Sequence, residues 1–179
     1  SGSFVKDIAD AATLPYTFNF PIGTTQYTPV SVTVSSGTLS TAVIHAKVVG
    51  EKHPSNSSVT DFINRYWTLS STGLTGASMN VTGTYLTADI AGTEDNYWTG
   101  QYNGSSWTKL DAANAALNTI SGTGISSLGD FTAGESSAFV SGGFVTLTFI
   151  PEGYYRSDVD PLPVTDTFTA TLASATGPD

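Results

Sequence analysis

The sequence predicts an all-β, antiparallel β-sandwich of the immunoglobulin-like or jelly-roll-like kind, with at most one or two short helices. Apolar and hydroxyl side chains alternate along many short segments, as in Val30-Ser31-Val32-Thr33-Val34. Pairs such as asparagine–glycine and serine–glycine separate these segments. Charged residues make up only 12% of the 179 residues. Ser, Thr, Gly and Asn take their place, and these residues favour strand surfaces and turns over helix interiors.

Alternation with a period of two places one face of each strand in a core and the other face in water. The segments with this pattern, or with strand-forming composition between turn signals, are 16–20, 30–34, 38–49, 62–69, 79–85, 97–102, 106–110, 145–149 and 168–172. Within 38–49 the even positions Ala42, Ile44, Ala46 and Val48 are predicted to face inward. The same alternation places His45 on the outer face of that strand.

Turn-forming residues indicate where one strand is expected to end and the next to begin. Asn103-Gly104 predicts a hairpin between 97–102 and 106–110. Ser36-Gly37 and Ser71-Thr72-Gly73 predict turns that end one strand and begin another. Helix is expected at 111–117, where Asp111 would cap an alanine-rich turn, and a second short candidate spans 6–12.

The chain length fits one β-sandwich domain, which we expect over residues 18–179. Residues 1–17 are expected to form an N-terminal segment that is a tag, a linker or a strand donated to a neighbouring copy. In the last case Phe4, Val5 and Ile8 are the candidate self-assembly residues.

Charge and cysteine usage exclude several classes of function. Six basic residues are spread along the chain against 15 acidic ones, which gives a net charge of −9. Because no basic stripe is available to neutralise phosphates, we expect no nucleic-acid partner. No run is apolar and long enough for membrane insertion. The chain has no cysteine, which excludes disulfides, thiolate zinc sites and a cysteine nucleophile.

No catalytic constellation is visible, so the chain is not expected to be an enzyme. The nucleophile elbow Gly-x-Ser-x-Gly is missing, and the two histidines, His45 and His53, have no partner that the sequence specifies. Asp89, Glu94 and Asp95 cluster loosely, but a glycosidase needs two carboxylates facing each other across a cleft.

No cofactor is expected, with calcium as the exception that the sequence leaves open. Asp158 and Asp160 are candidate calcium ligands, because carboxylate oxygens in a loop suit this ion. The twelve-residue calcium-binding loop pattern is missing, and the alternative is a pair of solvated turn carboxylates.

Aromatic residues are the remaining candidates for a binding site. Trp98, Tyr102 and Trp107 could form a platform on which sugar rings stack. The alternative is that Trp98 and Trp107, on either side of the Asn103-Gly104 turn, pair across the hairpin and only stabilise the sheet. Trp67 shares a strand face with Leu69 and is expected in the core.

Several segments resemble β-sandwich modules of large secreted or cell-surface bacterial multidomain proteins, which are adhesin-like and contain repeats. These segments are Phe18-Asn19-Phe20-Pro21-Ile22-Gly23-Thr24, Tyr27-Thr28-Pro29-Val30, Asn64-Arg65-Tyr66-Trp67-Thr68-Leu69, Phe131-Thr132-Ala133-Gly134, Ile150-Pro151-Glu152-Gly153-Tyr154-Tyr155 and 166–172. The match extends over roughly residues 18–172. The resemblance implies export, a β-sandwich and a non-catalytic role, and it supplies no active site to transfer.

Together these observations predict a structural or adhesive module of a secreted or cell-surface protein. One version assembles into a fibre through the N-terminal strand, with other copies or other domains of a surface protein as partners. The alternative is a carbohydrate-binding module that uses exposed tryptophan and tyrosine residues, with a glycan as partner.

Overall fold

The computed structural model describes residues 2–139, which all belong to one compact unit. The predicted strands 145–149 and 168–172 and the calcium candidates Asp158 and Asp160 lie outside the described residues.

Within residues 2–139, ten strands form one sheet whose pairings are all antiparallel. The strands are β1 (Phe4–Ile8), β2 (Tyr16–Phe20), β3 (Val30–Val49), β4 (Phe62–Ile63), β5 (Tyr66–Thr84), β6 (Ile90–Ala91), β7 (Tyr97–Tyr102), β8 (Trp107–Ala112), β9 (Thr119–Ile125) and β10 (Asp130–Glu135). Three short 3₁₀ turns accompany them: η1 (Thr87–Asp89), η2 (Glu94–Asn96) and η3 (Ser136–Phe139). The prediction of an all-β, antiparallel fold is confirmed.

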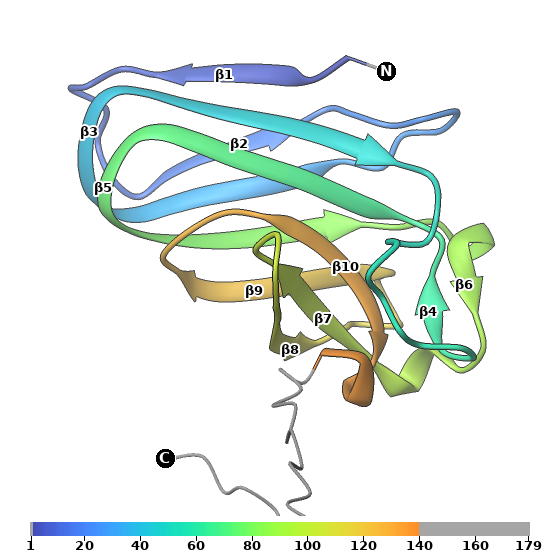
Figure 1. Cartoon of the computed structure of the whole chain (residues 1–179). Helices are drawn as coiled ribbons and strands as arrows, with labels where there is room; N and C mark the ends of the chain where they lie inside the picture. The colour runs from blue at the N-terminus through green and yellow to red at the C-terminus, as the bar shows by residue number, and fades with distance from the viewer. Residues whose placement is uncertain (1, 140–179) are drawn as a thin grey trace, which may run out of the picture. The chain divides into compact units, whose positions relative to one another are not determined.

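Two strands, β3 and β5, are far longer than the sequence predicts, at 20 and 19 residues. Both curl round at the same end of the sheet and return in a second layer, as Figure 1 shows. The residues predicted as turns, Ser36-Gly37 and Ser71-Thr72-Gly73, lie inside these bent strands. The prediction that strands end at these residues was therefore wrong. The β3–β5 ladder shifts register three times between Val34 and Val43, and such bulges bend a strand without ending it.

The bends divide the pairing order into two halves. On one side of the bends, β2, the first half of β3, the second half of β5 and β9 follow one another. On the other side the order is β1, the second half of β3, the first half of β5, β10, β7 and β8. The two faces of the core therefore belong to a single sheet that is folded over.

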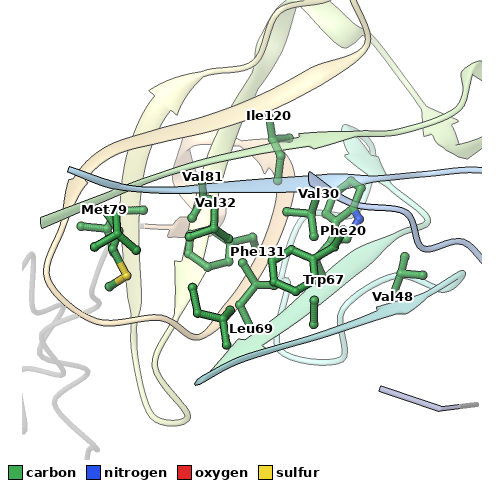
Figure 2. Close-up of a cluster of buried hydrophobic side chains, with 14 of the residues drawn as sticks. Phe20, Val30, Val32, Val48, Trp67, Leu69, Met79, Val81, Ile120 and Phe131 are labelled. Atoms are coloured by element: carbon green, nitrogen blue, oxygen red, sulfur yellow. The ribbon is translucent and has the colours of Figure 1, made fainter. Parts of the chain in front are cut away.

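The predicted alternation produces the core. The even positions of β3 on both sides of its bend are buried, and the intervening residues are half-buried or exposed. Side chains from both halves of β3 and β5 meet in one cluster, which Figure 2 shows around Val32, Val81 and Leu69. Trp67 is fully buried, as expected, and its indole N–H donates a hydrogen bond to the carbonyl oxygen of Thr28 at 3.0 Å.

Both expected helices are replaced by strand and turn. Strand β8 continues to Ala112, which pairs with Trp98, and the chain then turns at 114–118. The side chain of Asn114 accepts a hydrogen bond from the Leu117 amide at 3.2 Å, and Asn118 has a φ of +51°. A single alanine-rich turn gains too little from helix formation to compete with these contacts. The segment 6–12 lies partly in β1.

The expected boundary at residue 17 does not separate a segment from the domain. Phe4–Ile8 pairs with residues 46–42 of β3, and Tyr16–Phe20 pairs with residues 34–30 of the same strand. Ile8 is only 2% exposed and belongs to the main core. The segment Phe4-Val5-Lys6-Asp7-Ile8 has no clean apolar–polar alternation, and burial of Ile8 together with the β1–β3 ladder ties this strand to the sheet.

The bend of β5 generates a testable prediction at two glycines with similar left-handed backbones, Gly73 (φ +69°) and Gly76 (φ +58°). A Cβ atom at Gly73 would lie 2.2 Å from the carbonyl oxygen of Ser40, whereas one at Gly76 meets nothing within 4 Å. Gly76→Ala should therefore lower the free energy of unfolding by about 1–2 kcal/mol, the cost of a left-handed alanine. Gly73→Ala should cost about 1–3 kcal/mol more, because backbone must move.

Urea denaturation of the two variants beside the unmodified chain measures this difference. Equal destabilisation by the two substitutions would contradict the close approach of the two bends.

Candidate functional site

The hairpin of β7 and β8 carries the three aromatic residues predicted as a sugar platform. Its loop follows the Asn103-Gly104 prediction, with the Asn103 amide donating a hydrogen bond to the Ser106 carbonyl at 3.1 Å. This loop length places Tyr102 opposite Trp107, so Trp98 lies opposite Ala112 instead. The expected cross-strand pairing of the two tryptophans was therefore wrong.

Trp107 and Tyr102 lie together, with their ring centroids 5.0 Å apart. Trp107 is only 7% exposed, and its indole N–H donates a hydrogen bond to the carbonyl oxygen of Ser55 at 2.9 Å. It forms a second small core with Ala138 and Phe139. A buried indole whose N–H is already bonded offers no open face to a sugar.

His53 completes this cluster, and its neighbourhood could not be predicted from the sequence. The imidazole is 3% exposed, and its ring centroid lies 4.9 Å from that of Trp107 and 4.8 Å from that of Tyr66. Its Nδ1 accepts a hydrogen bond from the backbone amide of Ser55 at 3.1 Å. The other ring nitrogen, Nε2, lies 3.1 Å from the Asp130 carboxylate.

These two contacts assign the protonation of His53. An acceptor at Nδ1 requires the neutral ring to carry its proton on Nε2, which then donates to Asp130. Burial alone would raise the pKa of the Asp130 carboxyl, but hydrogen bonds from His53 and Thr68 outweigh it and lower the pKa below 3.8. With both ring nitrogens hydrogen-bonded, the His53–Asp130 pair joins a loop to β10.

The loosely clustered acids predicted at 89–95 also have structural partners. Arg65, itself 3% exposed, donates from Nε and Nη2 to the Asp89 carboxylate at 2.6 and 2.9 Å. The Tyr85 hydroxyl donates to Glu94 at 2.5 Å, and burial together with this carboxylate raises the pKa of Tyr85. Since Asp89 and Glu94 are held by different partners, they do not form a facing carboxylate pair.

Trp98, another of the platform candidates, lines an open hollow. It is half-buried and borders a hollow of about 420 Å³ that also has Asp61, Asn96 and Glu135 in its wall. The Lys109 ammonium lies 4.4 Å from the centroid of the Trp98 ring, a cation–π contact. The hollow therefore combines part of an indole with amide and carboxylate groups.

The predicted self-assembly residues lie on both faces of β1: Phe4 and Ile8 face inward, and Val5 faces outward. Phe4 is 36% exposed and Val5 is 48% exposed, whereas Ile8 is buried. The ring of Phe4 packs against Phe18 and Phe20 of β2, with centroid separations of 5.9 and 5.8 Å. Phe4 thus links the edge strand of one half of the sheet to the edge strand of the other.

Among residues 2–139, no group of three or more histidine, aspartate or glutamate side chains is arranged to hold a metal ion. In the same part of the chain, no helix is long and apolar enough to cross a membrane.

Comparison of the chain with protein-family models, with curated proteins and with solved structures finds no match.

Proposed function

We propose that this chain is a non-catalytic structural or adhesive module of a secreted or cell-surface protein. The observation that carries the proposal is that His53, Asp89, Glu94 and Trp107, which the sequence offers as candidates for chemistry, have partners inside the fold. Arg65 is paired with Asp89 and His53 with Asp130, and Trp107 is buried beside His53. Within residues 2–139 every buried side-chain nitrogen and oxygen has a hydrogen-bond partner. Export is supported by the sequence resemblance over residues 18–172.

Association between copies is the specific version that the sheet edges favour. In the described part of the chain, β1 and β2 each pair with β3 alone, so each ends its half of the sheet. An edge strand is the part of a sheet that a second copy can contact or replace with a strand of its own. Phe4 and Val5, on opposite faces of β1, add partly exposed apolar surface at this edge.

The proposal predicts association that depends on concentration and on β1. Phe4→Glu should weaken it about tenfold, because it places a charge on the exposed apolar surface that β1 offers to a second copy. Val59→Glu is the matched control, since Val59 is 83% exposed and lies outside the strands. Light scattering coupled to size-exclusion chromatography, with electron microscopy, measures the assemblies. A chain that stays monomeric up to millimolar concentration, or equal weakening by both variants, would contradict assembly through β1.

A carbohydrate-binding module is the second candidate, and the hollow beside Trp98 is the observation that favours it. Sugar recognition combines an apolar ring face with a few hydrogen-bonding groups, and Trp98, Asn96 and Glu135 supply both. Tyr102 and Trp107 would support the hairpin without contacting the sugar.

If this candidate is correct, Trp98→Ala should reduce glycan affinity about tenfold, which corresponds to about 1.4 kcal/mol of lost stacking. Tyr27→Ala is the control, because Tyr27 is 59% exposed and outside the hollow. A glycan array finds the ligand, and calorimetry compares the variants. An array without binding would remove this candidate.

A further inference from the structure

The first strand of the described chain is attached to the rest of the fold in an asymmetric way. Its inward residues, Phe4, Lys6 and Ile8, contact both halves of the sheet: Ile8 enters the core, and the Lys6 ammonium lies 4.9 Å from the centroid of the Phe18 ring. Its backbone pairs with one strand only, through five residue pairs with β3. The strand therefore has a specific docking place, and its backbone is paired along one edge only.

The connection from β1 to β2 is a short turn that the sequence specifies weakly. It reverses the chain at 9–12, with the Ala12 amide donating to the Ala9 carbonyl at 2.8 Å. Asp10 accepts a hydrogen bond from the Thr41 amide at 2.6 Å. The turn sequence Ala9-Asp10-Ala11-Ala12 contains neither glycine nor proline, the residues that enforce tight turns. Straightening it would project β1 away from its own β3.

Direct pairing of edge to edge is disfavoured on both open strands. The β1 edge carries Lys6 and Asp7 in its middle, and charged residues at these places oppose association with another strand. The β2 edge lies between Pro15 and Pro21, which cannot donate backbone hydrogen bonds and so limit any added ladder. Copies that associate on this side need another way to pair.

We propose that copies associate by strand exchange: β1 of one copy docks on β3 of a second copy, in the place that the second copy's own β1 occupies in the structure. The exchanged strand meets the same residues, Ala42–Ala46 and the Phe18–Phe20 pair, so no new complementarity is required. Residues 9–15, when extended, span up to about 25 Å, enough to pass between adjoining copies. Each copy gives one strand and accepts one, which permits either a closed dimer or a growing fibre.

This inference rests on the proposed function, because it states how the module would join its own copies. The cysteine-free chain allows a direct test by disulfide trapping. Val5 lies opposite His45 in the β1–β3 ladder, and directly opposite residues bring their Cα atoms to about 4.5–5.5 Å, within disulfide range. Both side chains lie on the outer face, so cysteines there leave the core intact.

The decisive sample mixes full-length Val5→Cys chains with full-length His45→Cys chains, refolded together at rising concentration and then oxidised. Exchange predicts a disulfide between residue 5 of one chain and residue 45 of the other, identified by non-reducing gels and mass spectrometry, in an amount that grows with concentration. Val5→Cys/His45→Cys in one chain is the folding control, because its intramolecular disulfide shows that the register and the thiols are competent. Asp7→Cys with Val43→Cys repeats the test at a second opposite pair.

A mixture of Ser31→Cys and Thr82→Cys chains is the matched negative control, since this pair joins β3 to β5 within the bent frame. It should give no mixed disulfide. Strand exchange would be overturned if the copies associate and the double variant forms its intramolecular disulfide, but the mixture forms no disulfide between residues 5 and 45. That result would leave the building-block function standing. Disulfides between two copies of Val5→Cys instead would assign the contact to edge-to-edge pairing. Failure of the chain to associate at all would overturn both exchange and the self-assembling version of the function.

Discussion

The bending of β3 and β5 is the constraint on which the rest of the structure depends. Each strand contributes to both halves of the sheet, so a single β3–β5 ladder supplies the centre of both layers. Positive φ values at Gly37, Thr41 and Gly73 occur at the bends, where an ordinary L-residue is strained. Val30–Val34 and Ala42–Val48 then both contribute to one core, and β1, β2, β9 and β10 pair directly with this frame. The strands β4 and β7 pair with β10, and β6 and β8 follow them.

Polar pairs fix the ends of this frame. Arg65, at the start of β5, binds Asp89 in η1 and also donates to the Thr28 hydroxyl at 3.2 Å. His53 connects its loop to Asp130 at the start of β10. Removing one partner of the buried Arg65–Asp89 pair would leave an uncompensated buried charge, which is costly. From the sequence His53 and Asp89 are candidates for a catalytic or metal site, but in the fold they connect loops to strands.

The sequence was sufficient for the all-β, antiparallel class, the inward faces of β3 and the β7–β8 hairpin, because alternation and Asn103-Gly104 are local signals. It was insufficient for the bends, since Ser36-Gly37 has the same composition whether a strand ends or only bulges. The His53–Asp130 pair joins residues 77 positions apart, and no local pattern encodes that contact. For Trp107, burial depended on Ser55 and Phe139, which only the tertiary fold brings near.

The central claim is that a rigid β3–β5 frame carries a separately detachable β1. Native-state hydrogen exchange followed by NMR measures the opening free energy of each amide directly. The account predicts that the amides joining β3 to β5 exchange only with global unfolding. The amides joining β1 to β3 should exchange at least about 100-fold faster, through local opening that leaves the frame intact. Equal protection of the two ladders would contradict the account, because β1 would then belong to the same cooperative unit as the frame.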